Sequence, residues 1–568
     1  MTTSDSSARS PRLGGHLLVD QLRLHGADHV FCVPGESYLA VLDGLVDSGM
    51  QVTVCRQEGG AAMMADAYGK LTGRPGICMV TRGPGASNAM AGVHIASQDS
   101  TPMILLVGQV ERGMLEREAF QEMDYKAVFG TQAKWVAQID QVERIPEMMA
   151  RAFHVAASGR PGPVVLALPE DMLTDSTDAP DARPMTPLGI HPSPEQLQAM
   201  RQMLDKARQP VFILGGGAWD EEAVLSLERI AGRHAAAVCV EFRRQMLFST
   251  RHDCFIGDLG LGANPDLLDY LRQADLIVLL GGRLPEVPSQ SYTLLGIPQA
   301  GTPLIHVHPD SAELNRVYQA DLAINSTPRD FVRALAQDPP APRQAGPALQ
   351  AMRQRYLRWS DPSGIRVPGA LQMGRIMAHL ADTLPAHAIL CNGAGNYATW
   401  VHRFHPFQRY GTQLAPTSGS MGYGLPAAVA AKRLQPDTPV LCFAGDGCFM
   451  MHGQEFATAV QYGLPIVVIV IDNGMYGTIR MHQERQYPGR ESATALRNPD
   501  FAALAQAYGG WGETVLDSEE FPAALERAQA SGLPALIHCL LDPQAISPST
   551  TLDAIRTRAE QARRSDSL

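Results

Sequence analysis

Between residues 439 and 474 the chain reads Pro439-Val-Leu-Cys-Phe-Ala-Gly-Asp-Gly447 and, after a stretch with helical character at 454–462, Leu464-Pro-Ile-Val-Val-Ile-Val-Ile-Asp-Asn-Gly474. Each apolar run is short and continuous, which is typical of a buried strand. A strand–helix–strand unit of this kind is a parallel crossover, and it brings both strand ends to the same edge of the sheet. Asp446 and Asn473 are therefore predicted to be neighbours at the edge where ligands of open α/β sheets bind.

The residues at this edge suit a metal-bridged diphosphate. The carboxylate of Asp446 and the amide oxygen of Asn473, completed by a backbone carbonyl and by water, form a hard oxygen site for Mg²⁺ or Ca²⁺. Gly445 and Gly447 have no Cβ, so the backbone can approach a phosphate and point N–H groups at it. The alternative interpretation is that Asp446 caps a helix and Asn473 makes a turn.

The same pattern resembles the signature of thiamine diphosphate enzymes, which is GDG, a gap of this size, and NN or DN. A second segment, Arg56-Gln-Glu58 followed by a helix at 59–71, fits the R-x-E-x-x-A-x-x-A-D-x-Y pattern of that family. The resemblance implies that Glu58 contacts N1′ of the cofactor's aminopyrimidine; taken alone, it would be a favourable charge at a helix start. Ala119-Phe-Gln-Glu-Met-Asp124 is similar to the A-F-Q-E-x-D of acetolactate synthase large subunits. The resemblance extends over residues 13–545.

The family resemblance also implies roles for single residues. Met421 matches the large apolar residue on which the cofactor bends, and Gln121 matches a glutamine on the substrate side. Gly395-Asn-Tyr397 lies where acetolactate synthases have G-Q-H, so we expect it at the diphosphate with Tyr in place of His. The catalytic residues implied are Glu58 and Gln121; those implied for the metal are Asp446, Asn473 and Met475; those implied for the cofactor are Glu58, Gly395, Asn396, Tyr397, Gly419, Met421, Gly445, Asp446, Gly447, Cys448, Asn473, Met475 and Tyr476.

The chain is long enough for several domains, and its composition divides it into three. Of its 568 residues 45% are hydrophobic and 18% charged, as in an ordinary globular protein. Connectors rich in proline at 174–195 and 338–347 separate three segments in which strands and helices alternate, so we expect three doubly wound parallel-sheet α/β domains. The expected divisions are a flexible tail at 1–12, a pyrimidine-binding domain at 13–173, a central Rossmann-like domain at 196–337, a diphosphate-binding domain at 350–545 and a charged C-terminal tail at 546–568.

Charge and cysteine content restrict partners and location. The net charge of −11 argues against nucleic acid and anionic membranes as partners. The N-terminal residues lack the apolar region of a signal peptide, and no apolar run reaches transmembrane length. Nine cysteines with no C-x-x-C pair indicate reduced core thiols in a cytoplasmic protein. The resemblance implies a homodimer or homotetramer in which Glu58 and Asp446 serve one cofactor from different chains.

The central segment departs from the pattern of flavin-binding relatives. Its opening strand and glycine turn, Val211-Phe-Ile-Leu-Gly-Gly-Gly217, does not match G-x-G-x-x-G. Acetolactate synthases that bind FAD carry G-M-L-G-M-H-G and G-x-R-F-D-D-R in this domain. Here the corresponding stretches read Gly257-Asp-Leu-Gly-Leu-Gly262 and Gly281-Gly-Arg-Leu-Pro-Glu-Val287. We therefore expect thiamine diphosphate and Mg²⁺ as cofactors, and FAD is not supported.

We infer a carboligase that resembles the acetolactate synthase large subunit and takes a 2-oxo acid as donor. The adjacent histidines typical of pyruvate decarboxylases are missing from Ala96-Ser-Gln-Asp-Ser-Thr-Pro102, but His482 stands where biosynthetic acetolactate synthases have a tryptophan. Arg480 and His482 either solvate a surface or face the cofactor and favour a bulkier or anionic acceptor. The alternatives are a decarboxylase or C–C lyase of the benzoylformate decarboxylase or 2-hydroxyacyl-CoA lyase kind, and a non-catalytic binding protein that keeps the fold.

Overall fold

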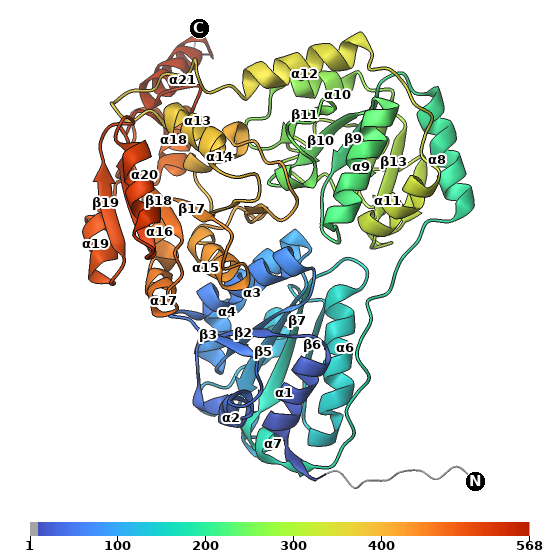
Figure 1. Ribbon diagram of the computed structural model, residues 1–568, viewed down its shortest axis with the longest axis vertical. Coiled ribbons are helices and arrows are strands. Elements are labelled where there is room, and N and C mark those ends of the chain that lie inside the picture. The colour runs from blue at the N-terminus through green and yellow to red at the C-terminus, as the bar shows by residue number, and fades with distance from the viewer. Residues whose placement is uncertain (1–9, 567–568) are drawn as a thin grey trace. The chain divides into compact units, whose positions relative to one another are not determined.

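The computed structural model describes residues 10–566, which form two compact units divided after residue 188 (Figure 1). The first unit holds one six-stranded sheet and the second holds two. All strand pairs within these three sheets are parallel. The prediction of three parallel-sheet α/β domains is confirmed.

The sheet of the first unit has the strand order β3-β2-β4-β5-β7-β6. Its strands are β2 (His29–Cys32), β3 (Gln51–Val54), β4 (Gly76–Val80), β5 (Met103–Gln109), β6 (Trp135–Gln138) and β7 (Pro163–Pro169). Its helices are α1 (Gly14–Leu24), α2 (Leu39–Leu45), α3 (Glu58–Thr72), α4 (Gly83–Asp99), α5 (Tyr125–Phe129), α6 (Ile145–Ala157) and α7 (Glu170–Thr174). Strand β4 is buried along its whole length, as expected for a parallel strand covered on both faces.

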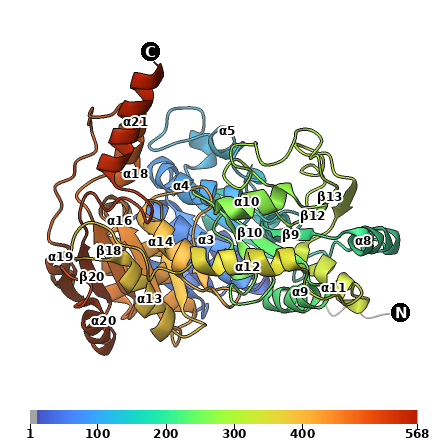
Figure 2. The same ribbon diagram turned by 90° about the horizontal axis from the view of Figure 1, so that it is seen from above.

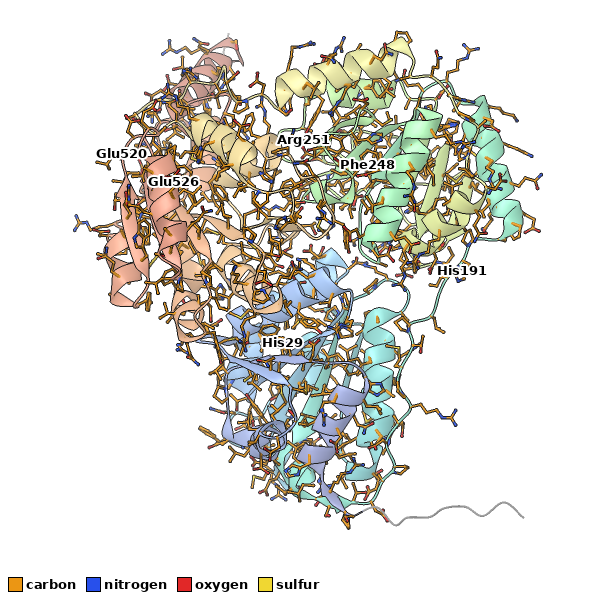
Figure 3. The ribbon with its side chains drawn as sticks, viewed as in Figure 1. His29, His191, Phe248, Arg251, Glu520 and Glu526 are labelled. Atoms are coloured by element: carbon orange, nitrogen blue, oxygen red, sulfur yellow. The ribbon has the colours of Figure 1, made fainter. Side chains whose placement is uncertain are left out.

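The central sheet of the second unit has the order β11-β10-β9-β12-β13-β14. Its strands are β9 (Pro210–Leu214), β10 (Ala237–Glu241), β11 (Phe255–Leu259), β12 (Leu276–Leu280), β13 (Leu304–His308) and β14 (Leu322–Asn325). Helices α8 (Pro194–Lys206), α9 (Glu221–His234), α10 (Pro265–Arg272) and α11 (Pro328–Gln337) accompany it. Phe248, labelled in Figure 3, is fully buried in the core of this domain, where its ring stacks on that of Phe255.

The third sheet has the order β16-β15-β17-β18-β20-β19. Its strands are β15 (Ile389–Asn392), β16 (Gln413–Leu414), β17 (Val440–Gly445), β18 (Val467–Asp472), β19 (Trp511–Val515) and β20 (Ala535–Leu540). Its helices are α13 (Met373–Thr383), α14 (Tyr397–Phe404), α15 (Gly424–Leu434), α16 (Asp446–His452), α17 (Glu455–Gln461), α18 (Gly477–Gln486), α19 (Phe501–Ala507) and α20 (Phe521–Ala530). Numbered within each domain, the first and third sheets share the order 2-1-3-4-6-5, whereas the central sheet has the order 3-2-1-4-5-6.

Helix α20 illustrates how the third sheet is covered. Phe521, Leu525 and two alanines of this helix are buried, while Glu520 and Glu526 are exposed at its outer side (Figure 3). This division of apolar and charged residues follows the helical period and directs one face of the helix to the sheet.

The structure differs from the expected domain limits at three places. Helix α12 (Pro347–Trp359), most of which we assigned to the diphosphate-binding domain, packs into the central core through Leu349, Met352 and Tyr356. Residues 546–568, expected to be a charged tail, contain helix α21 (Leu552–Asp566), because Leu552 and Ile555 give it an apolar face. Of the expected tail at 1–12, residues 1–9 lie outside the described residues, and β1 (Arg12–Leu13) pairs with β8 (Ser176–Thr177).

Two further findings concern helices and cysteines. Among residues 10–566, no helix combines the length and the apolar composition needed to cross a membrane. All nine cysteines of the chain are free and buried, which agrees with the prediction of core thiols.

Candidate active site

The third sheet brings the two predicted motifs together at the carboxyl ends of its strands. In the parallel register of β17 and β18, Gly445 lies opposite Ile471. Asp446, which follows β17, and Asp472, the last residue of β18, are therefore side by side at the edge of the sheet. The side-chain amide of Asn498 joins them, since its Nδ2 donates to Asp446 Oδ2 and to Asp472 Oδ1 at 2.8 Å each. The strand ends are thus neighbours, as the crossover predicts.

The pKa values of the two carboxyl groups at this edge are shifted in opposite directions. Burial raises the pKa of Asp446 to about 6; Asp472 adds to the rise, while the Gly447 N–H and Asn498 oppose it. Burial also acts to raise the pKa of Asp472, but hydrogen bonds outweigh it and lower this pKa, above all the bond from His538, whose Nε2 lies 3.0 Å from Asp472 Oδ2. A divalent cation beside Asp446 would stabilise its charged form in this buried position. The Asp446 carboxylate is therefore suited to bind a metal ion.

The loop after β18 carries the other expected ligands. Gly474 has a φ of 69° and donates its N–H to Asp472 Oδ1 at 2.9 Å. The Met475 carbonyl accepts the N–H of Gly477 at 2.8 Å, and Tyr476 N–H donates to the Thr494 carbonyl at 2.9 Å. Because a carbonyl oxygen has two lone pairs, that of Met475 can still accept a metal. Asn473 is half-buried and begins this loop. Its amide oxygen is of the hard oxygen type that could join Asp446 around Mg²⁺.

The glycines of the Gly-Asp-Gly turn are required by close packing of aromatic rings. A Cβ on Gly447 would lie 2.6 Å from the ring of Tyr476, and a Cβ on Gly445 would lie 3.0 Å from the ring of Tyr397. Any larger residue at either position would displace a ring, so these glycines keep the turn narrow. A turn without Cβ atoms beside a carboxylate is the kind of backbone that a diphosphate can approach.

The side chain of Tyr397 points into the interior of the third domain. Its hydroxyl accepts the N–H of Gly393 at 3.1 Å and lies 3.2 Å from Cys448 Sγ, and burial raises the pKa of this phenol well above its usual value. The Gly422 N–H also points at Cys448 Sγ, at 3.2 Å. The Tyr397 hydroxyl is thus engaged inside the domain, because a phenol is longer than an imidazole and reaches the core.

The remaining expected contacts lie on two loops of the same unit. Asn396 accepts the hydroxyl hydrogen of Thr478, at the start of α18, at 2.9 Å. Gly395 and Gly419 have φ values of 148° and 68°, which favour glycine. Met421 is half-buried and packs against the core of the third sheet, so its side chain has both a support and an open side.

In the first unit, Glu58 is held at the start of helix α3. Gln57 caps this helix by accepting the Gly60 N–H at 3.1 Å. Asn88 Nδ2, from helix α4, donates to Glu58 Oε2 at 2.9 Å. A Cβ on Gly85 would lie 3.4 Å from Glu58 Oε1. Helix α4 therefore fixes one carboxylate oxygen through Asn88, and the other keeps capacity for a further donor.

Gln121 lies in a loop whose backbone is tied to helix α4. It has a φ of 64°, and its carbonyl accepts the Gly83 N–H at 2.9 Å. The adjacent Phe120 is 72% exposed, so it does not pack within its own unit. Arg82, a buried residue that the sequence did not single out, lies beside Gly83 and pairs with Glu36 and Glu170.

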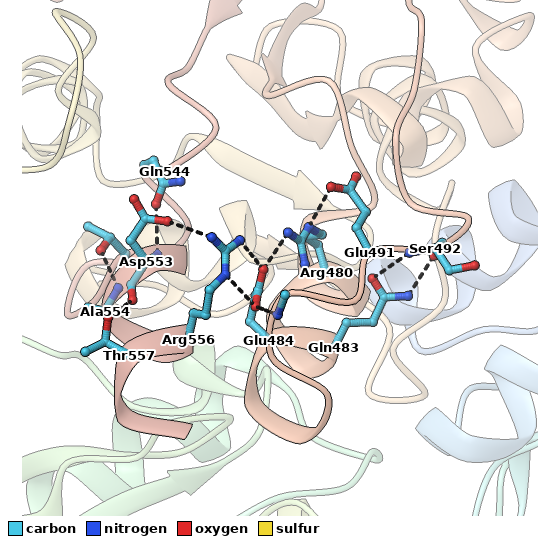
Figure 4. Close-up of polar contacts among 12 residues, drawn as sticks. Arg480, Gln483, Glu484, Glu491, Ser492, Gln544, Asp553, Ala554, Arg556 and Thr557 are labelled. Atoms are coloured by element: carbon cyan, nitrogen blue, oxygen red, sulfur yellow. Dashed lines mark hydrogen bonds and ion pairs between the residues drawn. The ribbon is translucent and has the colours of Figure 1, made fainter. Parts of the chain in front are cut away.

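Arg480 and His482 face different surroundings, although both lie on α18. Arg480 is buried and pairs with Glu484 at 2.5 Å and Glu491 at 3.4 Å (Figure 4). His482 is exposed, with Nδ1 3.5 Å from the guanidinium of Arg485. Both interpretations stay open for His482, whereas Arg480 belongs to an internal ion network.

The same ion network holds helix α21 on helix α18. Arg556 of α21 donates Nε–H to Glu484 Oε2 at 2.9 Å and also pairs with Glu484 Oε1 (Figure 4). Beside it, Ile546, Leu552 and Ile555 form a small apolar cluster with Met475 and Met481. Figure 2 shows α18 and α21 side by side. Helix α21 is thus attached through Met475 to the loop that follows β18.

Three polar residues of the site escaped the sequence analysis: Asp472, Asn498 and His538. Asp472 was quoted as part of the Asp-Asn pair without a role, and Asn498 and His538 lie in stretches with no motif. The position of His538 inside the apolar strand β20, next in the sheet to β18, is the one signal that could have identified it, since a buried histidine needs a polar partner.

Comparison with known proteins identifies all three domains. Residues 12–128, 197–335 and 393–539 match the N-terminal TPP binding domain, the central domain and the C-terminal TPP binding domain of thiamine pyrophosphate enzymes, respectively. The chain is 31% identical to the acetolactate synthase isozyme 2 large subunit of Escherichia coli (strain K12), over 93% of this chain and 95% of that protein.

Two other relatives are similar over comparable lengths. The chain is 31% identical to the acetolactate synthase large subunit of Corynebacterium glutamicum, over 92% of this chain and 86% of that protein. It is also 31% identical to that of Parasynechococcus marenigrum, over 94% and 88%. The chain therefore belongs to the thiamine pyrophosphate enzyme family and is a thiamine-diphosphate-dependent enzyme of the acetolactate synthase type.

Proposed function

We propose that this enzyme is an Mg²⁺-dependent carboligase that joins a 2-oxo acid donor to a second carbonyl compound. The observation that carries the proposal is the junction of β17 and β18, where Asp446 and the Asp472-Asn473 pair leave adjacent strands and Asn498 bridges the two carboxyl groups. When bound, thiamine diphosphate supplies a carbon nucleophile and an electron sink for breaking and forming C–C bonds. The protein has to bind and orient the cofactor and the substrates and to move protons.

The metal ligands in this proposal are Asp446, the amide oxygen of Asn473 and the backbone carbonyl of Met475. Asp446 uses Oδ2 for the hydrogen bond from Asn498, so Oδ1 is the oxygen that would bind the ion. Asp472 accepts from Asn498, His538 and Gly474, and it therefore orients the ligands without binding the metal. Outer residues of this kind strongly affect metal affinity.

Glu58 is the proton-handling residue of the proposal. Its Oε2 is occupied by the Asn88 amide, and Oε1 would hold a proton shared with N1′ of the aminopyrimidine. A carboxylate in that place favours protonation of the ring. Gln121 is proposed to face the substrate, since its loop is tied to the helix that fixes Glu58.

Carboligation is favoured over simple decarboxylation by two features. The segment at 119–124 keeps the pattern of acetolactate synthases, and residues 96–102 lack the paired histidines of pyruvate decarboxylases. The relatives at 31% identity are named as acetolactate synthases. A decarboxylase or C–C lyase is the second candidate, supported by the exposed His482 in place of a tryptophan.

Product analysis with pyruvate distinguishes the candidates. The purified enzyme with thiamine diphosphate and Mg²⁺ is expected to form acetolactate, detected by its conversion to acetoin in acid. Free acetaldehyde without acetolactate would favour the decarboxylase, and cleavage of a 2-hydroxyacyl-CoA without pyruvate turnover would favour the lyase. Asp446→Ala, which removes a proposed metal ligand, is the matched control for background reaction.

We further propose a homodimer or homotetramer in the cytoplasm. Glu58 and Asp446 would then serve one cofactor from two chains, and mixing Glu58→Gln with Asp446→Ala protein should restore activity at mixed interfaces. The buried free state of all nine cysteines supports a reducing compartment.

A further inference from the structure

The central sheet has a switch point of its own, separate from the site described above. Its strand order reverses between β9 and β12. In open α/β sheets this is the crevice where dinucleotides bind, on glycine turns that let the backbone approach the pyrophosphate. Because the family includes members that hold FAD in this domain, the crevice is the place to test whether these residues fit a flavin.

Two glycine turns border the crevice, and they touch each other. One follows β9 and contains Gly215 and Gly216; the other follows β12 and contains Gly281 and Gly282. A Cβ on Gly216 would lie 1.9 Å from the Gly281 carbonyl oxygen, and a Cβ on Gly281 would lie 2.7 Å from that of Gly215. These glycines are therefore used for packing backbone against backbone. The space between the turns cannot hold a pyrophosphate.

The side chain of Glu241, the last residue of β10, lies against both glycine turns. Glu241 is 7% exposed, and its carboxyl oxygens lie 2.0 Å from an added Cβ on Gly215 and 2.5 Å from one on Gly282. Its Oε1 accepts the N–H groups of Arg283 at 3.0 Å and Leu284 at 2.6 Å. In dinucleotide folds, backbone N–H groups of such turns bind phosphate oxygens.

Acidic residues occupy the start of the helix at this edge, while Arg244 and Arg283 lie near enough to favour the charged form of Glu241. Helix α9, which follows the first glycine turn, is capped by Asp220, whose side chain accepts the Ala223 N–H at 2.9 Å. Glu221 and Glu222 occupy its first turn. Acidic side chains here take up the positive end of the helix dipole. The indole of Trp219 covers the turn by donating to the Gly215 carbonyl at 2.8 Å.

We propose that the side chain of Glu241 occupies the crevice in which sheets of this kind bind dinucleotides. Its carboxyl group accepts the backbone N–H groups that would otherwise bind a phosphate, and so closes the central domain to FAD and nucleoside diphosphates. The residues present do not fit a flavin, so the domain acts as a scaffold. This proposal concerns a site apart from the reaction centre and does not depend on which carbonyl compounds the enzyme joins.

Binding of ADP and FAD tests the proposal without an activity assay. The holoenzyme, saturated with thiamine diphosphate and Mg²⁺, is titrated with ADP by calorimetry and with FAD by flavin fluorescence. Glu241→Ala is compared with Asp269→Ala, which removes the same charge from an exposed pair with Arg272 on this domain. Glu241→Gln keeps the volume and one acceptor oxygen, so it should leave the crevice closed.

The expected result is no saturable binding of either ligand to the wild type, Asp269→Ala or Glu241→Gln. Glu241→Ala should bind ADP saturably, with an affinity at least about tenfold above any residual binding by the wild type, because two backbone donors become available to the phosphate. Equal ADP affinity of Glu241→Ala and wild type would overturn the proposal. If Glu241→Ala fails to fold, two results still overturn it: stoichiometric FAD released from denatured wild type, and ADP binding by Glu241→Gln that is absent from wild type.

Discussion

Replacing Glu484 by glutamine should detach helix α21 from helix α18. The Glu484 side chain is fully buried, and its carboxylate accepts Arg556 Nε–H at 2.9 Å and the Gly489 N–H at 2.8 Å, with Arg480 paired at 2.5 Å (Figure 4). Glutamine keeps the shape of the side chain but has no charge to offer two guanidinium groups. Arg556 would then keep only its pair with Asp553 of the same helix. Helix α21 would be held by Leu552 and Ile555 and by the hydrogen bond from Arg563 to the Gln486 carbonyl.

The size of the effect follows from the pKa of Glu484. The pairing, led by the hydrogen bond from Arg556, lowers this pKa from 4.5 to about 2. Each unit corresponds to about 1.4 kcal/mol, so the whole shift is worth roughly 3 kcal/mol. Only the share due to Arg556 belongs to docking of α21, because Arg480 and Gly489 lie on α18 and the loop after it. Because the folded pKa lies below that of the unfolded chain, this stabilisation is complete above a pH of about 4.5 and is lost as the pH falls toward 2.

Hydrogen exchange of α21 measures this free energy directly. At neutral pH, loss of the Arg556 share, at most roughly 3 kcal/mol, corresponds to up to about a hundredfold faster exchange of α21 amides in Glu484→Gln if they exchange through undocking. Glu147→Gln is the control, because Glu147 pairs with Arg144 on an exposed helix surface of the first unit and should leave α21 unchanged. Equal exchange of α21 in Glu484→Gln and wild type would show that apolar contacts alone hold the helix, and would refute the argument from charge.

Other predictions concern the cofactor and the substrate. Asp446→Ala should lose thiamine diphosphate and Mg²⁺ binding together, and near-native cofactor affinity by calorimetry would contradict the metal assignment. Asn498→Ala, which removes the bridge between two carboxyl groups, should weaken Mg²⁺ by about 10–100-fold without abolishing the site; unchanged affinity would show that Asn498 only packs. Glu58→Gln should bind the cofactor but slow exchange of its C2 proton by about 10²–10⁴, and an unchanged NMR exchange rate would exclude Glu58 as activator. With His482 in place of a large indole, competition between pyruvate and 2-oxobutanoate as acceptors should show weak or altered discrimination, since the apolar area lost is worth about 10–200-fold; a strong 2-oxobutanoate preference would place another residue at the acceptor wall.

Local sequence determined most of the fold and half of the candidate site. Continuous apolar runs such as those of β17 and β18 can be stable only when buried on both faces, and this requires parallel strands with helices between them. The crossover then places Asp446 beside the Asp-Asn pair. The position of Glu58 at the start of a helix after a strand also follows from local sequence.

Only the tertiary structure decided which polar groups complete the site. Asn498 and His538 lie 26 and 66 residues after Asp472 in the chain, and no local pattern links them, because a hydrogen bond depends on position in space and not on sequence period. The same holds for Tyr397, whose hydroxyl turns inward to Cys448.

The domain boundaries and the position of Glu241 in the central domain also depended on tertiary packing. Helix α12 joins the central core and helix α21 docks on α18 because apolar faces of short helices find partners that the sequence does not name. Glu241 reads in the sequence as an ordinary acid at a strand end. Its occupation of the space between two glycine turns follows from the strand order, which brings β9, β10 and β12 together, and from the rule that a buried carboxyl group must find donors.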